Sequence, residues 1–235
     1  MPLMRLLRVL TPGPRGTPLP PSIPSTHTRG VFLTFEGIEG SGKTTQLRRL
    51  AAHLAAKGVP HLVTREPGGT PLADRIRELL LSPREETVFP ETELLLYEAA
   101  RAQHVREAIL PALEAGKAVL CDRFCDATTA YQGHARGFGA EEVARLNRFA
   151  AGGLIPDLTL LFDLPPETGF ARLAARGRAV DRMELEPLSF HRAVREGYLR
   201  LLDHHAGRIA RIDAALPEEE VFRRVLETVG ARFGW

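Results

Sequence analysis

The sequence has few cysteines and no hydrophobic run of membrane-spanning length. Cys121 and Cys125 are its only cysteines, so no second pair is present to complete a four-ligand zinc site. Two free thiols suit a reducing compartment, and we therefore expect a cytoplasmic protein. Because no apolar run approaches the roughly 20 residues of a membrane-spanning helix, we expect no membrane partner.

The chain also has little net charge, and this charge is unevenly distributed. The formal charge is +2 over 235 residues. Residues 1–29 hold four arginines and no acidic residue, which leaves 27 basic and 29 acidic residues, or −2, for residues 30–235. A folded part with this balance has no broad basic surface, so we expect no nucleic acid among its partners.

Residues 1–29 are rich in proline, and the sequence predicts that they form a disordered extension. Six prolines between residues 12 and 24 are incompatible with a continuous helix or sheet strand. The extension could be a targeting peptide, a polyproline arm that binds a partner, or the product of a misassigned start, with translation beginning near Val31. Its apolar stretch is short and interrupted by charge, and we favour the last interpretation.

The stretch FEGIEGSGKTT at residues 35–45 fits the phosphate-binding pattern G-x-x-x-x-G-K-[ST]. An apolar run at 30–35 predicts a buried strand before it, and apolar residues at helical spacing predict a helix over 44–57 after it. Strand, glycine loop and helix are the order that such a loop requires. The nucleotide-binding residues are therefore predicted to be Gly37, Ile38, Glu39, Gly40, Ser41, Gly42, Lys43, Thr44 and Thr45.

These residue types suit a polyphosphate. Glycines let main-chain N–H groups approach the phosphates without a Cβ in the way, and the start of the following helix faces the anion. Lys43 can reach the β and γ oxygens, and the hydroxyl group of Thr44 is placed to ligate Mg²⁺.

Apolar runs alternate with helical patterns along the rest of the chain, which predicts an α/β fold. Further strands are expected at 59–64, 118–121, 158–162 and 208–212. Helices are expected at 71–81, 91–115 with a bend or division at Pro111, 127–131, 141–151, 167–176, 189–206 and 217–229. Apolar strands separated by helices indicate a five-stranded parallel sheet with helices on both faces, in a three-layer P-loop fold over residues 30–235.

Polar residues stand where four of these strands end. They are the phosphate-binding loop, Arg65, the pair Asp122 and Arg123, and Asp163. Since ligands bind beyond the carboxyl ends of the strands in such sheets, we expect these residues to surround one cleft. An arginine-rich stretch at about 176–186 is expected to be a lid that closes on phosphate, whereas Arg172 is explained by a solvated helix face.

Seven segments carry a resemblance to a known family. They are residues 35–45, 64–70 (TREPGGT), 97–101 (YEAAR), 122–124 (DRF), 130–133 (AYQG), 156–160 (PDLTL) and 176–184 (RGRAVDRME). In this order they resemble the bacterial thymidylate kinases (dTMP kinases), from Val31 nearly to the C-terminus. The resemblance implies phosphorylation of dTMP to dTDP with ATP and Mg²⁺, by an enzyme that is typically a homodimer.

The resemblance also implies how the phosphates are held. Arg65 and Arg123 would bind the 5′-phosphate of the acceptor, because planar guanidinium groups suit an oriented phosphate. The lid would supply the arginine that acts on the transferring group. The predicted catalytic residues are therefore Lys43, Arg65, Arg123, Arg176, Arg178 and Arg182.

For the acceptor nucleoside, the resemblance implies that Tyr97 stacks on thymine and that Arg101, one helical turn later, reads the edge of the base. Tyr131 and Gln132 match the segment that lines the sugar and base. Glu39 matches an acidic position near the 3′-hydroxyl and Mg²⁺, and the predicted metal ligands are Thr44, Glu39 and Asp122.

Two positions depart from the family pattern. Ala127 stands where a serine that contacts the base is usual, and Tyr97 replaces the commoner phenylalanine. Neither change removes the phosphate-binding residues, but the first leaves the discrimination between bases open.

The attacking atom would be a phosphate oxygen that is already anionic, so no general base is required, and catalysis reduces to positioning and charge stabilisation. One alternative is a kinase for another monophosphate, such as dUMP or CMP. A second is a P-loop switch or a catalytically silent nucleotide-binding protein. A GTP switch would need an Asn-Lys-x-Asp segment, yet the only asparagine, Asn147, precedes Arg148.

Overall fold

The structure of the protein is a computed structural model that describes residues 29–83, 85–175, 177 and 181–235. The predicted extension, apart from Arg29, lies outside the described residues. So do Arg176 and Arg178 of the predicted lid.

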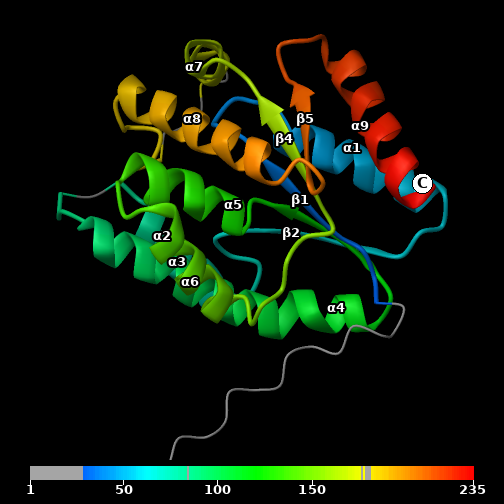
Figure 1. The fold of residues 1–235 in the computed structure, drawn as a ribbon, viewed down its shortest axis with the longest axis horizontal. Coiled ribbons are helices and arrows are strands. Elements are labelled where there is room, and N and C mark those ends of the chain that lie inside the picture. Colours follow the sequence, from blue (N-terminus) through cyan, green and yellow to red (C-terminus); the bar gives the residue numbers. More distant parts are fainter. Residues whose placement is uncertain (1–28, 84, 176, 178–180) are drawn as a thin grey trace, which may run out of the picture.

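A five-stranded parallel sheet forms the centre of the protein, with the strand order β2-β3-β1-β4-β5 (Figure 1). The strands are β1 (Phe32–Glu36), β2 (His61–Arg65), β3 (Ala118–Asp122), β4 (Leu158–Asp163) and β5 (Ile209–Asp213). All five predicted strands are present, and the predicted α/β fold is confirmed. The central strand β1 is buried along its whole length, as expected of a parallel sheet covered on both faces.

The described α-helices are α1 (Lys43–Ala56), α2 (Pro71–Leu81), α3 (Pro90–His104), α4 (Leu110–Glu114), α5 (Cys125–Thr128), α6 (Ala140–Ala150), α7 (Pro166–Ala174), α8 (Leu188–His204) and α9 (Glu218–Phe233). Two π-helical segments, Val105–Ile109 and Thr129–Ala135, join α3 to α4 and extend α5. None of the described helices is long and apolar enough to cross a membrane.

Side chains of β1 alternate between two hydrophobic cores, as the two-residue period of a strand requires. Leu33 and Phe35 belong to the core that includes Leu50 of α1. Phe32 belongs to the core that includes Ile109 and the residues around α4. Figure 1 shows α1 and α9 on one side of the sheet and α4 with α3 on the other. This packing fixes the sheet between two layers of helices.

The predicted helix over 91–115 is divided, as expected, by the π-helical segment Val105–Ile109 that ends two residues before Pro111. The amide of Leu110 donates to the carbonyl of Val105, a π-helical bond, and α4 begins there. Pro111 has no amide hydrogen for the regular ladder and fits best in the first turn of a helix. The proline therefore explains the change of helix type just before it.

The predicted short helix at 127–131 is longer in the structure, because it packs against α8. It starts at Cys125 and continues as the π-helical segment to Ala135. Gly197 of α8 permits this approach, since a Cβ there would lie 3.1 Å from the Cα of Ala130. Tertiary packing thus extends a helix beyond its local sequence pattern.

Candidate active site

One cleft opens beyond the carboxyl ends of the strands. Parallel register places Arg65 beside Asp122 and Phe35 beside Asp122, so the ends of β1, β2 and β3 meet at one edge. The predicted site residues that line the cleft are Glu39, Gly40, Gly42, Lys43, Thr44, Thr45, Arg65, Tyr97, Arg101, Asp122, Arg123, Tyr131 and Gln132. The structure therefore brings the two predicted acceptor arginines and the P-loop lysine into the same cleft.

The P-loop has the backbone that its glycines allow. Gly37, Gly40 and Gly42 have φ angles of 137°, 72° and 84°, which residues other than glycine rarely adopt. A Cβ at Gly40 would lie 2.1 Å from the carbonyl oxygen of Gly169. The loop is thus closely packed from behind and leads directly into the N-terminus of α1, an arrangement suited to an anion.

Lys43 is buried at the start of α1, and its ammonium group donates to the carbonyl of Ile38 at 3.2 Å. Burial is the main cause that lowers the pKa of Lys43, and the nearby charge of Arg123 lowers it further. An anion in the cleft would offset both effects, because a nearby negative charge stabilises the charged form of the lysine.

The hydroxyl group of Thr44 donates to Oδ2 of Asp122 at 2.5 Å. A hydroxyl and a carboxylate are oxygen donors of the kind that Mg²⁺ prefers, and Mg²⁺ usually adds phosphate oxygens and water to such ligands. Among the described residues, no three His, Cys, Asp or Glu side chains form a metal site by themselves. The pair fits an ion that arrives with a nucleotide.

Glu39 is held by Arg123 and Tyr131. Its Oε1 atom accepts from Nη2 of Arg123 at 2.7 Å and from the hydroxyl group of Tyr131 at 2.6 Å. Nδ1 of His191 lies 3.3 Å from its Oε2 atom. Burial opposes ionisation of Glu39, but Arg123 and the other partners outweigh it and lower the pKa of this carboxyl group. Glu39 is thus an ionised partner of Arg123 in the structure.

Arg123 is the only described residue other than glycine with a positive φ angle, 71°. Its amide donates to the carbonyl of Phe35 at 3.0 Å, and Nη1 donates to the hydroxyl group of Tyr198 at 3.2 Å. Its guanidinium group lies 5.0 Å from the centre of the Tyr131 ring. Several contacts therefore maintain an unfavourable backbone conformation that points Arg123 into the cleft.

Glu36, which ends β1, supports this arrangement and was not predicted. It is fully buried and accepts from the amide of Phe124 and the hydroxyl group of Tyr198, each at 2.7 Å. Burial and the nearby Asp126 raise the pKa of Glu36 to about 8. An acidic residue at the end of an apolar strand was the signal in the sequence that could have identified it.

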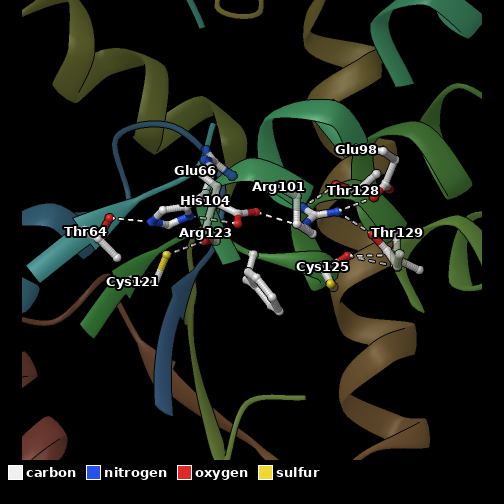
Figure 2. Close-up of polar contacts among 12 residues, drawn as sticks. Thr64, Glu66, Glu98, Arg101, His104, Cys121, Arg123, Cys125, Thr128 and Thr129 are labelled. Carbon is white, nitrogen blue, oxygen red and sulfur yellow. Dashed lines mark hydrogen bonds and ion pairs between the residues drawn. The ribbon is translucent and has the colours of Figure 1, made fainter. Parts of the chain in front are cut away.

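Arg101 is almost wholly occupied by other protein groups (Figure 2). Nε donates to Glu66 at 2.8 Å, Nη1 donates to Glu98 at 3.1 Å and to Asn147 at 2.5 Å, and Nη2 donates to Thr128 at 2.9 Å. These bonds use four of the five N–H groups of the guanidinium. Arg101 can therefore offer a ligand one N–H from a fixed position.

Glu66 connects Arg101 to the loop that follows β2. Its second oxygen lies 3.0 Å from Nδ1 of His104, and Nε2 of His104 lies 2.6 Å from the hydroxyl group of Thr64 (Figure 2). This buried chain of contacts fixes α3 against the end of β2, and thereby Arg101 relative to Arg65.

Arg65 is half-exposed and pairs with Asp74 at 2.9 Å. Arg77 of α2 also lines the cleft, and it donates to the carbonyl of Pro67 at 2.9 Å. Burial and the neighbouring charge of Arg65 lower the pKa of Arg77. Arg77 was not predicted, because in the sequence it is one of two arginines, with Arg75, on an amphipathic helix.

Arg182, the one described arginine of the predicted catalytic lid set, does not line the cleft. Its Nε donates to the carbonyl of Leu80 at 2.7 Å, and Nη2 donates to Glu93 at 2.6 Å. It therefore holds the second half of the predicted lid against α2 and α3.

A second cleft adjoins the other side of the P-loop. Ser41 and Gln46 lie on one wall, and the segment from Ala214 to Glu218 lies on the other. Arg172 lines it and donates to the carbonyl of Ala214 at 2.9 Å. A solvated helix face therefore does not describe Arg172 fully.

The family model described as thymidylate kinase matches residues 35–225. The thymidylate kinase of Pseudomonas entomophila (strain L48) is 55% identical over 196 residues, which cover 83% of this chain and 93% of that protein. The thymidylate kinase of Carboxydothermus hydrogenoformans is 52% identical over 194 residues, which cover 83% of this chain and 94% of that protein. The thymidylate kinase of Geobacillus sp. (strain WCH70) is 46% identical over 202 residues, which cover 86% of this chain and 96% of that protein.

Glu36→Gln should make the protein more stable than the wild type at high pH. The pKa of Glu36 is about 8 in the folded chain against an ordinary value of 4.5, so the folded state binds more protons between these values. The contribution of Glu36 to the free energy of unfolding therefore falls as pH rises through this window, whereas glutamine stays neutral. We expect the variant to gain more than about 1 kcal/mol over the wild type between about pH 5 and about pH 8.5, measured by urea denaturation.

Glu114→Gln, at an exposed position at the end of α4, is the matched control and should give no such trend. A stability difference between Glu36→Gln and the wild type that stays constant with pH would contradict the assignment of Glu36.

Proposed function

The chain belongs to the thymidylate kinase family, and we propose that it transfers the γ-phosphoryl group of ATP to the 5′-phosphate of dTMP, giving dTDP and ADP. The observation that carries this proposal is that Lys43, Arg65 and Arg123 line one cleft. A phosphate donor and a phosphate acceptor can both be neutralised there.

On the donor side, the P-loop amides and Lys43 would hold the phosphates of ATP. Thr44 and Asp122 would hold Mg²⁺, which when bound neutralises phosphate oxygens. Glu39, the third predicted metal ligand, is engaged with Arg123 and would contribute only after that contact is released. The second cleft continues from the P-loop and would take the adenosine of ATP beside Arg172.

On the acceptor side, Arg65, Arg77 and Arg123 would hold the 5′-phosphate of dTMP. Its attacking oxygen is anionic at neutral pH, so no residue is needed as a general base. Glu39 and the hydroxyl group of Tyr131 lie together at the cleft, where they suit the sugar and its 3′-hydroxyl.

The base would lie between Tyr97, Arg101 and Gln132, all of which line the cleft. The one remaining N–H of Arg101 suits a single carbonyl group at the edge of the base. Ala127 lines the same wall and adds no polar group. Base discrimination would then depend on Arg101 and Gln132.

The arginine of the lid that acts on the transferring group would be Arg176 or Arg178, both outside the described residues. Because Arg182 is bound by Glu93 and by the carbonyl of Leu80, we assign it to anchoring the chain that follows them.

ADP release with a panel of monophosphates tests the proposed function. We expect dTMP to give the highest kcat/KM, and we expect dUMP and dCMP to be poorer by at least about tenfold. ADP release that is the same with and without an acceptor would point instead to an ATPase, a switch or a silent binding protein.

Arg123→Ala should abolish turnover and leave ATP affinity nearly unchanged. Loss of an arginine that holds the acceptor in line should cost on the order of a thousandfold in kcat/KM for dTMP. Steady-state kinetics and ATP titration check the two effects, with Arg200→Ala as the control because Arg200 is exposed on α8 and pairs with Glu196. An equal loss of turnover and ATP affinity in a folded variant would contradict the assignment.

We also propose a cytoplasmic homodimer. Cys121 and Cys125 are free thiols, which suits a reducing compartment. Large apolar side chains are exposed on α3 and on the two helices beside it, α2 and α6. Figure 1 shows how these three helices are arranged. The exposed side chains are Leu72 and Leu79 of α2, Leu95 of α3 and Phe149 of α6. Leu72 and Leu79 are two helical turns apart and so share one face, and a second copy would cover this patch.

Leu79→Glu should weaken the dimer, because it places a charge in the proposed apolar contact. We expect a dissociation constant at least about tenfold higher, measured by analytical ultracentrifugation over a range of concentrations. Leu185→Glu changes an exposed leucine outside these helices and should leave assembly unaltered. A monomeric wild-type protein would refute the proposed dimer.

A further inference from the structure

Glu93 of α3 is a fully buried carboxylate to which three side chains donate hydrogen bonds. Its Oε1 atom accepts from Nε2 of Gln132 at 2.8 Å and from Nε of Arg136 at 3.2 Å. Its Oε2 atom accepts from Nη2 of Arg136 at 3.1 Å and from Nη2 of Arg182 at 2.6 Å. The carboxylate therefore joins α3, the chain around the π-helical segment Thr129–Ala135 and the second half of the predicted lid.

Hydrogen bonds from its partners keep Glu93 ionised although it is buried. Burial opposes its ionisation, but hydrogen bonds from Arg136 and Gln132 outweigh burial and lower the pKa of the carboxyl group. An ionised carboxylate can only accept hydrogen bonds. Of the two orientations of the Gln132 amide, only the one with its NH₂ group toward Glu93 is favourable, since the other would place two oxygen atoms face to face.

The same contact determines what Gln132 can offer to a ligand. Gln132 is buried and lines the cleft beside Arg101. Within the described part of the chain, no group donates a hydrogen bond to its Oε1 atom. With an N–H of its NH₂ group donated to Glu93, the amide turns its oxygen, an acceptor without a partner among the described residues, away from Glu93.

We propose that Glu93 is a specificity-determining positioning residue, which holds the amide of Gln132 so that its oxygen faces the base of the acceptor nucleotide. This inference rests on the proposed function. Thymine and uracil carry a hydrogen atom at N3, whereas N3 of cytosine is an acceptor. The oxygen of Gln132 would stabilise the first two bases and repel the third, while the remaining N–H of Arg101 would donate to the neighbouring carbonyl group.

Arg136 and Arg182 determine what happens when Glu93 becomes glutamine. Two guanidinium N–H groups face Oε2, whereas one faces Oε1. In Glu93→Gln the new NH₂ group is therefore favoured at the Oε1 position, next to Gln132. The amide of Gln132 would turn its oxygen toward that group and present its own NH₂ group to the cleft.

Glu93→Gln should reduce the kcat/KM of dTMP relative to that of dCMP by about tenfold or more. In the variant the NH₂ group of Gln132 would face the N3–H group of thymine, so that two donors oppose each other. N3 of cytosine is an acceptor and would not be opposed. The ratio of dTMP to dUMP should not change, since both bases carry the N3 hydrogen. General damage to the site would lower turnover with all three substrates together.

Glu186→Gln is the matched control. Glu186 shares Arg136 with Glu93, at 2.5 Å, but makes no contact with Gln132, so its variant should keep the wild-type ratio of dTMP to dCMP. Gln132→Leu is the second test, which also covers a Glu93→Gln variant that fails to fold. It removes the acceptor while Glu93 keeps both arginines, and it should lower the same ratio.

The outcomes separate this inference from the proposed function. A wild-type enzyme without turnover of dTMP would refute the function. A wild-type enzyme that prefers dTMP over dCMP, with the preference kept in folded Glu93→Gln or in Gln132→Leu, would refute the role of Glu93 alone. A lowered ratio in both variants, with the wild-type ratio in Glu186→Gln, is the supporting result.

Discussion

The ion pair between Arg123 and Glu39 is the contact on which the site depends. A cleft built to bind two phosphate-bearing molecules must gather cations, and like charges in a poorly hydrated space destabilise one another. Burial, and to a smaller extent the charge of a neighbouring arginine, lowers the pKa of both Lys43 and Arg77. Glu39 offsets the cost of burying the positive charge of Arg123, because a buried guanidinium group with no anionic partner would be strongly destabilising. The 2.7 Å contact therefore allows the protein to keep an arginine oriented in the cleft before any phosphate is bound.

The acidic residues behind the cleft act in the same way on the groups that would recognise the base. Arg101 gives most of its N–H groups to Glu66, Glu98 and their neighbours, and Gln132 gives its NH₂ group to Glu93. Each of these contacts restricts the orientation of a side chain that could otherwise adopt several conformations. What remains for a ligand is one donor and one acceptor in fixed places, and fixed polar groups discriminate between bases better than mobile ones.

The sequence allowed the sheet and the P-loop to be predicted, because both depend on local patterns. Apolar runs identified all five strands, and the spacing from Gly37 to Thr44 identified the loop. The pairing of charges could not be predicted, since partners such as Glu93 and Arg182 are 89 residues apart and meet only through packing. For the same reason Arg77 and Glu36 were missed. The prediction of a catalytic role for Arg182 came from its place in the lid motif, and no local pattern indicated its contact with Glu93.

In the proposed reaction, binding of the acceptor becomes an exchange of one anion for another at Arg123. The phosphate would take the place of the Glu39 carboxylate, so the buried guanidinium is never left without a partner, and most of its desolvation has already occurred in the folded protein. Glu39 would then be released next to Tyr131, at the part of the cleft assigned to the sugar and near Thr44 and Asp122. A single carboxylate could thereby serve first as a substitute for the substrate phosphate and afterwards as a ligand for the sugar or the metal. This order of events would explain why the acidic Glu39 lies inside a loop that is proposed to bind anions.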